Sequence, residues 1–240
     1  MAAPSNWCWN SPRRCHTSNN CSPASTAAAW YGVGSTCAAA KPASAPPPRP
    51  ELFSFDGRHM LSTLGPGYRL LLIGAGALAE YLATMALFNG FSVSLCDPRP
   101  EYTAGWNVAG VNHLAGMPDD VVRAFAPDLR SAIVAVSHDP KLDDLALLEA
   151  LHSPAFYIGA IGSRRNSQLR RERLIEHFGE SEASLQRLHG PIGIYIGSKT
   201  PAEIAVSVMA EILAAKNDVT LPGAVSVTRA KEAEQLARAL

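Results

Sequence analysis

The sequence has no surplus of either charge, because lysine plus arginine and aspartate plus glutamate both number 21 among 240 residues. A basic surplus is typical of chains that bind nucleic acid or anionic membranes, so its absence argues against both partners. No apolar run approaches the ~20 residues that a membrane-spanning helix requires, and the first residues lack the charged, apolar and cleavage regions of a signal peptide. We therefore expect a cytoplasmic protein with no membrane or nucleic-acid partner.

Cysteine is scarce outside the first fifty residues, which hold four of the five cysteines and leave only Cys96 beyond them. The spacing of those four fits no zinc pattern, and the seven histidines show no metal-ligand spacing, so we expect no metal site. The same segment is rich in Ser, Ala and Pro, and its apolar residues follow neither a helix period nor a strand period. We expect residues 1–50 to be a low-complexity, disordered leader and residues 51–67 to be a junction.

From residue 68 onward, short apolar runs alternate with helix-like segments. Strands are expected at residues 68–73, 92–96, 111–114, 132–136 and 156–161, and within 190–197. Helices are expected at residues 77–88, 118–125 and 166–177, after Asp139-Pro140, and after a capping box at Thr200. This alternation predicts an α/β, Rossmann-like, doubly wound domain over residues 68–220, with a mostly parallel sheet and helices on both faces. Residues 221–240 are expected to form a flexible tail.

The first strand leads into a glycine loop of the Gly-x-Gly-x-x-Ala type. Gly74 and Gly76 permit a sharp turn and a close approach of the backbone to a ligand, and Ala77 opens the helix that follows. Free N–H groups and the helix dipole make such a helix start an anion site. Asp97 ends the next apolar run and is placed to accept hydrogen bonds from ribose hydroxyls. Arg99 is placed to contact a 2′-phosphate or a pterin phosphate, and a solvent-exposed loop salt bridge between Asp97 and Arg99 is the alternative.

Two further loops carry polar residues after predicted strands. Ser137, His138 and Asp139 are contiguous and so cannot form a Ser–His–Asp catalytic relay, which needs residues from distant segments; we expect His138 to face a ligand and Asp139 to cap a helix. The other loop ends in Gly162-Ser163-Arg164-Arg165 and offers a hydroxyl and two guanidinium groups at a helix start. The alternative is a merely solvated arginine face, made by Arg164, Arg165, Arg170, Arg171 and Arg173.

Right-handed crossovers bring all four loops to one edge of the sheet, where such folds bind ligands. The Tyr195-x-x-x-Lys199 spacing of short-chain dehydrogenases is rejected, because the two residues straddle a strand end and a helix cap. No catalytic residue is expected. The candidate cofactor-binding residues are Gly74, Gly76, Ala77, Asp97, Arg99, Ser137, His138, Asp139, Gly159, Gly162, Ser163, Arg164 and Arg165.

Over about 150 residues, the order and spacing of these motifs resemble the C-terminal Rossmann-type domain of the xanthine dehydrogenase accessory proteins, the XdhC/CoxI family. The likeness rests on the glycine loop, Asp97-Pro98-Arg99-Pro100-Glu101, and the segments 137–144, 157–165, 191–193 and 196–205. Members usually carry a separate N-terminal domain with a Gly-Gly-Cys-type segment. Residues 1–50 hold nothing like it, so we expect the Rossmann half alone.

The resemblance implies a maturation factor and not a metabolic enzyme. Such a factor binds molybdenum cofactor, as molybdopterin or its dinucleotide form, and assists its sulfuration and its insertion into xanthine dehydrogenase or a related molybdenum hydroxylase. A cysteine desulfurase and a second copy of the chain are further expected partners. Two alternatives stay open: an NAD(P)-dependent oxidoreductase, indicated by the glycine loop with Asp97, and a nucleotide-binding module without its partner domain.

Overall fold

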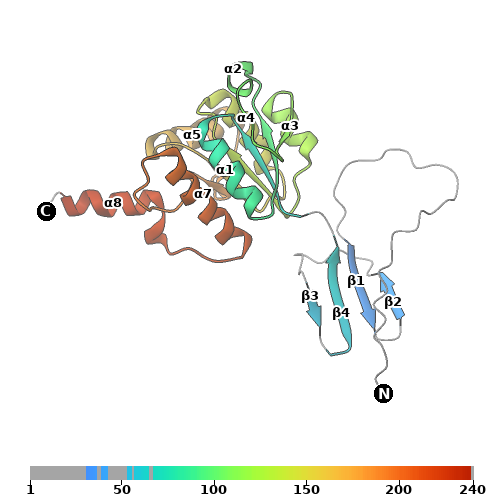
Figure 1. Ribbon diagram of the computed structural model, residues 1–240. Helices are drawn as coiled ribbons and strands as arrows, with labels where there is room; N and C mark the ends of the chain where they lie inside the picture. Colours follow the sequence, from blue (N-terminus) through green and yellow to red (C-terminus); the bar gives the residue numbers. More distant parts are fainter. Residues whose placement is uncertain (1–30, 37–38, 43–52, 56, 65–66, 239–240) are drawn as a thin grey trace.

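The computed structural model describes residues 31–36, 39–42, 53–55, 57–64 and 67–238. They form a small antiparallel sheet and a larger α/β body, which Figure 1 shows standing apart from each other. The small sheet has the order β2-β1-β4-β3. Its strands are β1 (Tyr31–Thr36), β2 (Ala39–Pro42), β3 (Phe53–Phe55) and β4 (His59–Leu64).

The α/β body has six parallel strands in the order β10-β9-β8-β5-β6-β7. In chain order these are β5 (Arg69–Ile73), β6 (Ser92–Cys96), β7 (Asn112–His113), β8 (Ser131–Ala135), β9 (Tyr157–Ala160) and β10 (Leu188–His189). Counted along the chain from β5, the order reads 3-2-1-4-5-6, which is that of the doubly wound dinucleotide-binding fold. The predicted fold class is confirmed.

Helices cover both faces of this sheet, as Figure 1 shows. In chain order they are α1 (Ala77–Phe88), α2 (Pro100–Thr103), α3 (Pro118–Phe125), α4 (Pro140–Leu151), α5 (Arg164–Phe178), α6 (Glu182–Leu185) and α7 (Pro201–Lys216). The chain continues through the 3₁₀ turn η1 (Gly223–Val225) into α8 (Val227–Arg238). None of the described helices is long and apolar enough to cross a membrane.

Alternate side chains along the strands pack into two separate hydrophobic cores, one on each face of the sheet. Leu70 and Leu72 of β5 point to the face covered by α1 and α7, whereas Leu71 and Ile73 point to the face covered by α3, α4 and α5. All four side chains are fully buried. A central parallel strand covered on both faces is therefore apolar throughout, which explains why β5 reads as an unbroken aliphatic run.

Two expected elements differ from the structure. A strand was expected within residues 190–197, but the sixth strand is β10, and Ile194 makes only an isolated bridge to Ser226. Pro191 has no N–H with which to continue the ladder, and Ile192 is buried in the core under α1 and α7. Beyond residue 221, where we expected a flexible tail, the chain forms η1 and α8.

Within the segment expected to be a disordered leader, residues 31–36 and 39–42 form β1 and β2, and the expected junction contains β3 and β4. Tyr31 pairs with Leu64 and Thr36 with His59, so the strand depends on a partner far along the chain that local periodicity does not reveal. The remaining leader residues, 1–30, 37–38 and 43–50, lie outside the described residues.

Candidate functional site

The carboxyl ends of the parallel strands bring the four predicted loop tips to one edge of the sheet. We call this edge the rim and define it by residues 74–77, 97–99, 137–139 and 162–165. The rim spans the point where the strand order reverses, between β5 and β8, and open α/β sheets bind ligands there. Contacts between neighbouring loops, described below, link the four loops in sequence.

The two glycines of the first loop have different roles. Gly74 has φ of +110°, and a Cβ built on it would lie under 3.0 Å from the backbone of Ser137. Gly74 is therefore required by the turn and by its packing against β8. Gly76 is the N-cap of α1, makes no side-chain capping bond, and has open space where a Cβ would stand. The N–H groups at the start of α1, which begins at the exposed Ala77, thus remain accessible to an anion.

Asp97 holds the glycine loop in place instead of facing outward. Its Oδ2 accepts a hydrogen bond from the N–H of Ala75 at 2.8 Å. The guanidinium group of Arg99 donates to both carboxylate oxygens, at 2.9 and 2.7 Å, and the Arg99 N–H donates to Oδ1 at 3.0 Å. Burial on its own raises the pKa of Asp97, but the hydrogen bonds from Arg99 and Ala75 outweigh it and lower the pKa. The carboxylate is thus ionised and fully engaged by the protein.

Arg99 lies across the outer side of this loop. Its guanidinium carbon stands 4.0 Å from the ring centroid of Tyr102, and the hydrogen bond to Asp97, with the nearby charge of Asp139, raises the pKa of Arg99. The salt bridge left open as an alternative is therefore present, at 2.7 Å. Its carboxylate partner is buried, and Arg99 is partly exposed at the rim.

The third loop combines a strained residue with a helix cap. His138 is exposed and has φ of +61°, which is uncommon for a residue other than glycine. Asp139 caps α4 by accepting a hydrogen bond from the N–H of Lys141 at 3.0 Å, as expected. The hydroxyl of Ser137 donates to Asp143 at 2.6 Å. The three residues thus do not form a catalytic relay, and His138 is the member that faces outward.

A buried ion network links the third loop to the fourth. Arg170 donates to Asp143 at 3.1 Å, to Asp144 at 3.0 Å and to the carbonyl oxygen of Ile161 at 3.1 Å. Arg173 completes the network by donating to Asp144 at 2.8 Å. Burial raises the pKa of Asp143, although the Ser137 hydroxyl and the Arg170 charge oppose it. The solvated arginine face is therefore wrong for Arg170, whose side chain is only 7% exposed.

At the fourth loop a cleft of about 480 Å³ opens between the start of α5 and α8. We call it the basic cleft; its lining residues are Gly162, Ser163, Arg164, Arg165, Pro191, Val227 and Lys231. Ser163 caps α5 by accepting a hydrogen bond from Asn166 at 3.1 Å. Arg165 and Lys231 are exposed, and none of the described residues that line the cleft is acidic. The surplus of positive charge and the nearby helix start suit an anion.

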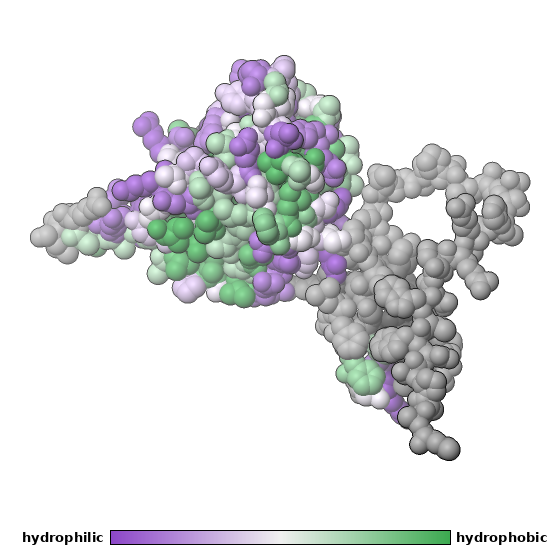
Figure 2. All heavy atoms as spheres, in the orientation of Figure 1, coloured by the Kyte–Doolittle hydropathy of each residue, from purple (hydrophilic) through white to green (hydrophobic). Residues whose placement is uncertain are grey.

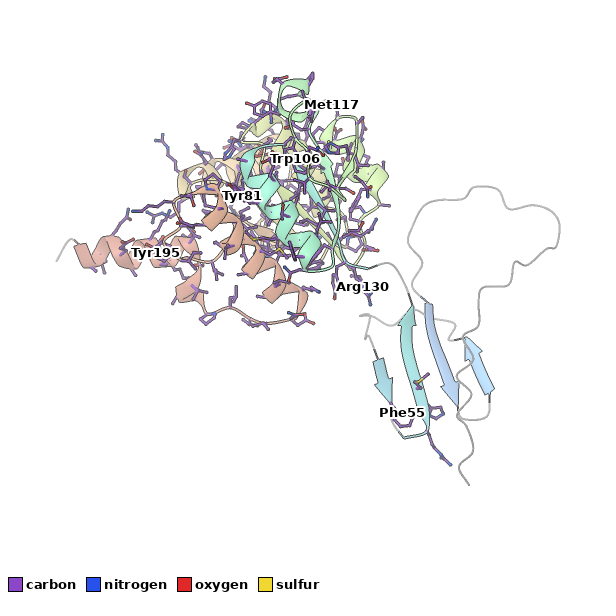
Figure 3. The ribbon with its side chains drawn as sticks, in the orientation of Figure 1. Phe55, Tyr81, Trp106, Met117, Arg130 and Tyr195 are labelled. Atoms are coloured by element: carbon purple, nitrogen blue, oxygen red, sulfur yellow. The ribbon has the colours of Figure 1, made fainter. Side chains whose placement is uncertain are left out.

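Helix α8 belongs to this cleft, which the sequence interpretation did not foresee. Arg164 donates to Gln235 at 3.0 Å and lies 3.9 Å from Glu232. The hydroxyl of Tyr195 donates to Glu234 at 2.6 Å, and Figure 3 shows Tyr195 lying beside α8. Tyr195 lies before α7, outside any helix, which confirms that the dehydrogenase-like spacing is coincidental.

Gly159 is not brought to the rim. It lies buried within β9, and a Cβ on it would collide with the side chains of Ile192 and Tyr157. Its role in the structure is packing. Residues that the sequence interpretation missed are Asp143, Arg170 and Lys231; the only local signal was an Asp143-Asp144 pair inside the apolar pattern of α4.

The fold defines a Rossmann-type domain in which the starts of α1 and α5 lie at the rim. The chain matches the model of the XdhC Rossmann domain over residues 70–212, and it belongs to that family.

Two relatives and one solved structure show the breadth of the likeness. A protein of Bacillus subtilis strain 168, described as a probable subunit of xanthine dehydrogenase, is 31% identical over 162 residues, which are 67% of this chain and 47% of that protein. The molybdenum cofactor insertion chaperone PaoD of Escherichia coli K12 is 25% identical over 147 residues, 61% of this chain and 40% of that protein. A crystal structure of a xanthine dehydrogenase from Bacillus halodurans shares the fold, with a TM-score of 0.56 and 24% identity, covering 72% of this chain and 48% of that one. The chain spans less than half the length of these proteins.

Proposed function

We propose that this domain binds molybdenum cofactor by its phosphate at the rim and serves in an accessory protein that assists insertion of the cofactor into xanthine dehydrogenase-type hydroxylases. The names of the two relatives support this role, one through xanthine dehydrogenase and the other through cofactor insertion. The observation that carries the proposal is the union of the four loop tips, with the uncapped start of α1 and the basic cleft as its anion-binding parts.

The fit is chemical. Molybdopterin carries one phosphate, and its cytosine-dinucleotide form carries a pyrophosphate. Backbone N–H groups after Gly76 and the side chains of Arg165 and Lys231 are donors of the kind that phosphates use. Asp97 takes no part in holding the ligand in this proposal, because its oxygens are engaged by Ala75 and Arg99. Its task is to hold the glycine loop in place through the Ala75 N–H.

The domain holds the cargo and does not supply its sulfur. Among the described residues the one cysteine is Cys96, which is buried. Burial, with a smaller contribution from Asp97, raises the pKa of this thiol to about 11, and the thiolate is the reactive form. We therefore propose that the sulfur for the cofactor's terminal ligand comes from a cysteine desulfurase partner while this domain shields the cofactor.

An NAD(P)-dependent oxidoreductase is the second candidate, favoured by the strand order and the glycine loop. Against it stands the engagement of Asp97, which leaves no free carboxylate oxygen for a ribose hydroxyl. A fluorescence titration with NADH and NADPH separates the two candidates: saturable binding that molybdopterin does not displace favours the oxidoreductase.

The direct test is retention of molybdopterin by the purified chain after gel filtration, followed by activation of cofactor-free xanthine dehydrogenase. Gly76→Ala is the informative variant, because its methyl group occupies the open space before α1. Arg123→Ala is the matched control, since Arg123 is paired with Asp120 and Glu149 on the surface. The proposal predicts retention by the wild type and control and a loss in Gly76→Ala; absence of both retention and activation by the wild type refutes it.

A further inference from the structure

A second cluster of titratable groups lies away from the rim, beneath α7. Glu211 accepts hydrogen bonds at Oε2 from the Tyr157 hydroxyl, at 2.7 Å, and from the Gly193 N–H, at 2.5 Å. Its Oε1 lies 2.9 Å from Nδ1 of His189. Burial on its own raises the pKa of Glu211, but these hydrogen bonds, with that of His189 the largest, lower it. An ionised carboxylate thus faces Nδ1 of His189 and fixes the proton on that nitrogen.

Two contacts fix the orientation of the His189 imidazole, and they leave its Nε2 atom unbonded within the described residues. Its ring packs on that of Tyr157, with centroids 4.6 Å apart and planes inclined by 30°, and Tyr157 is fully buried. In the tautomer whose Nδ1 donates to Glu211, Nε2 is a hydrogen-bond acceptor. Nε2 has no partner among the described residues, and the side chain is 38% exposed.

This histidine lines a cavity of about 450 Å³ between α7 and the segment that follows it. That volume is within the range of small-molecule sites, roughly 300–1,000 Å³. Its walls are mostly apolar, with Ile194, Ala214, Val219, Leu221 and Val225 among them. Figure 2 shows apolar surface gathered at the lower left of the α/β body, where the chain runs after α7 in Figure 1.

The charges of this cavity are opposite to those of the basic cleft. Its lining includes Glu211 and Asp218 but neither lysine nor arginine. A phosphate or carboxylate ligand is therefore disfavoured here. The cavity has mostly apolar walls and one fixed hydrogen-bond acceptor, Nε2 of His189. These features suit a molecule that has a single N–H donor on an otherwise apolar ring.

We propose that the cavity under α7 is a binding site for a small, uncharged nitrogen heterocycle whose ring N–H donates to Nε2 of His189. Glu211 and Tyr157 position the imidazole and do not touch the ligand. The site is distinct from the rim, and its existence does not depend on cofactor binding there.

Indole is the probe, because it is uncharged and has one N–H, and 1-methylindole is the matched control that lacks this donor. The imidazole signals of His189 are followed by NMR in the full chain as each compound is added. We expect saturable shifts of the His189 signals with indole, about five- to tenfold weaker binding of 1-methylindole through loss of one hydrogen bond, and no shift with inorganic phosphate.

Two variants locate the site. His189→Phe keeps the ring contact with Tyr157 but removes Nε2, so it is expected to abolish the preference for indole over 1-methylindole. Ala214→Leu places a larger apolar side chain in the cavity and is expected to abolish binding of both compounds. Equal binding of the two compounds by the wild type, absence of saturable shifts at His189, or unchanged binding by Ala214→Leu overturns the proposal. Because molybdopterin retention is measured separately, these outcomes leave the proposed function standing.

Discussion

Oδ2 of Asp97 lies 2.8 Å from the backbone nitrogen of Ala75, so the carboxylate at the end of β6 ties down the glycine loop at the end of β5. An acid at this position of a dinucleotide-binding fold commonly binds a ribose hydroxyl. Here its oxygens are shared between that loop and Arg99, and the groups exposed at the rim are backbone N–H groups and cations instead. The rim that we propose for phosphate recognition therefore leaves no free oxygen of Asp97 for a ribose hydroxyl.

Alanine substitution of the two loop glycines is expected to have different effects, lowering stability at Gly74 and phosphate binding at Gly76. Gly74→Ala places a Cβ against the backbone of Ser137 at a positive φ, and should lower the free energy of unfolding by about 1–3 kcal/mol. Gly76→Ala adopts its native φ of −91° without strain, so it should keep stability within ~0.5 kcal/mol and yet weaken phosphate binding. Urea unfolding and a phosphate titration of both variants check this; similar stability losses in the two would contradict it.

We expect the free energy of unfolding to depend on pH in the acid range because of Asp97. Because its pKa is lowered in the folded chain, the unfolded chain binds more protons between the folded pKa and the ordinary value of about 3.9, and stability rises with pH there. The contribution is complete above that ordinary value and is lost as pH falls through the folded pKa. Asp97→Asn should therefore be less stable than the wild type at pH 7, and the difference should shrink below about pH 4. A difference that stays constant from pH 7 to pH 3 would show that the charge is irrelevant.

The buried network depends on Arg170. Removal of its guanidinium group leaves Asp143 and Asp144 without that cation in an apolar surrounding, so Arg170→Met should cost about 3–5 kcal/mol. The neighbouring Arg171 lies 3.8 Å from the well-exposed Glu182, and Arg171→Met should change stability by less than ~0.5 kcal/mol. Thermal or urea unfolding compares the two, and equal effects would mean that the network contributes little.

The basic cleft should bind anions in a salt-dependent manner. Arg165→Ala and Lys231→Ala each remove a cation that lines it, so each should weaken phosphate binding several-fold, more at low than at high ionic strength. Stability should be nearly unaffected because both side chains are exposed. Arg123→Ala serves again as the control. Unchanged affinity in both cleft variants would exclude this cleft as a phosphate site.

Local sequence signals predicted the elements that depend on neighbouring residues. The capping box at Thr200 is present, with the Glu203 N–H donating to Thr200 and the Glu203 carboxylate accepting from the Thr200 N–H. Asp139 caps α4 as expected. Both interactions join residues three positions apart or fewer, so spacing alone reveals them.

Contacts between residues far apart in the chain could not be predicted from local sequence patterns. Arg170 and Asp143 are 27 residues apart, and nothing in either helix indicates that the other will neutralise its charge. The pairing of β1 with β4 and the docking of α8 through Tyr195 and Glu234, 39 residues apart, are of the same kind. The predicted sheet topology indicated where the loop tips lie. The hydrogen bonds of Asp97 to Ala75 and Arg99, in contrast, are evident only from the side-chain positions in the structure.

The central claim, that the rim holds the phosphate of molybdenum cofactor, is tested most directly by equilibrium binding of molybdopterin to the wild-type chain and to Gly76→Ala. The account predicts that the wild type binds and is competed by inorganic phosphate, and that the variant binds at least tenfold more weakly with unchanged unfolding. Equal affinity in the two proteins, or no molybdopterin binding by the wild type, would contradict it.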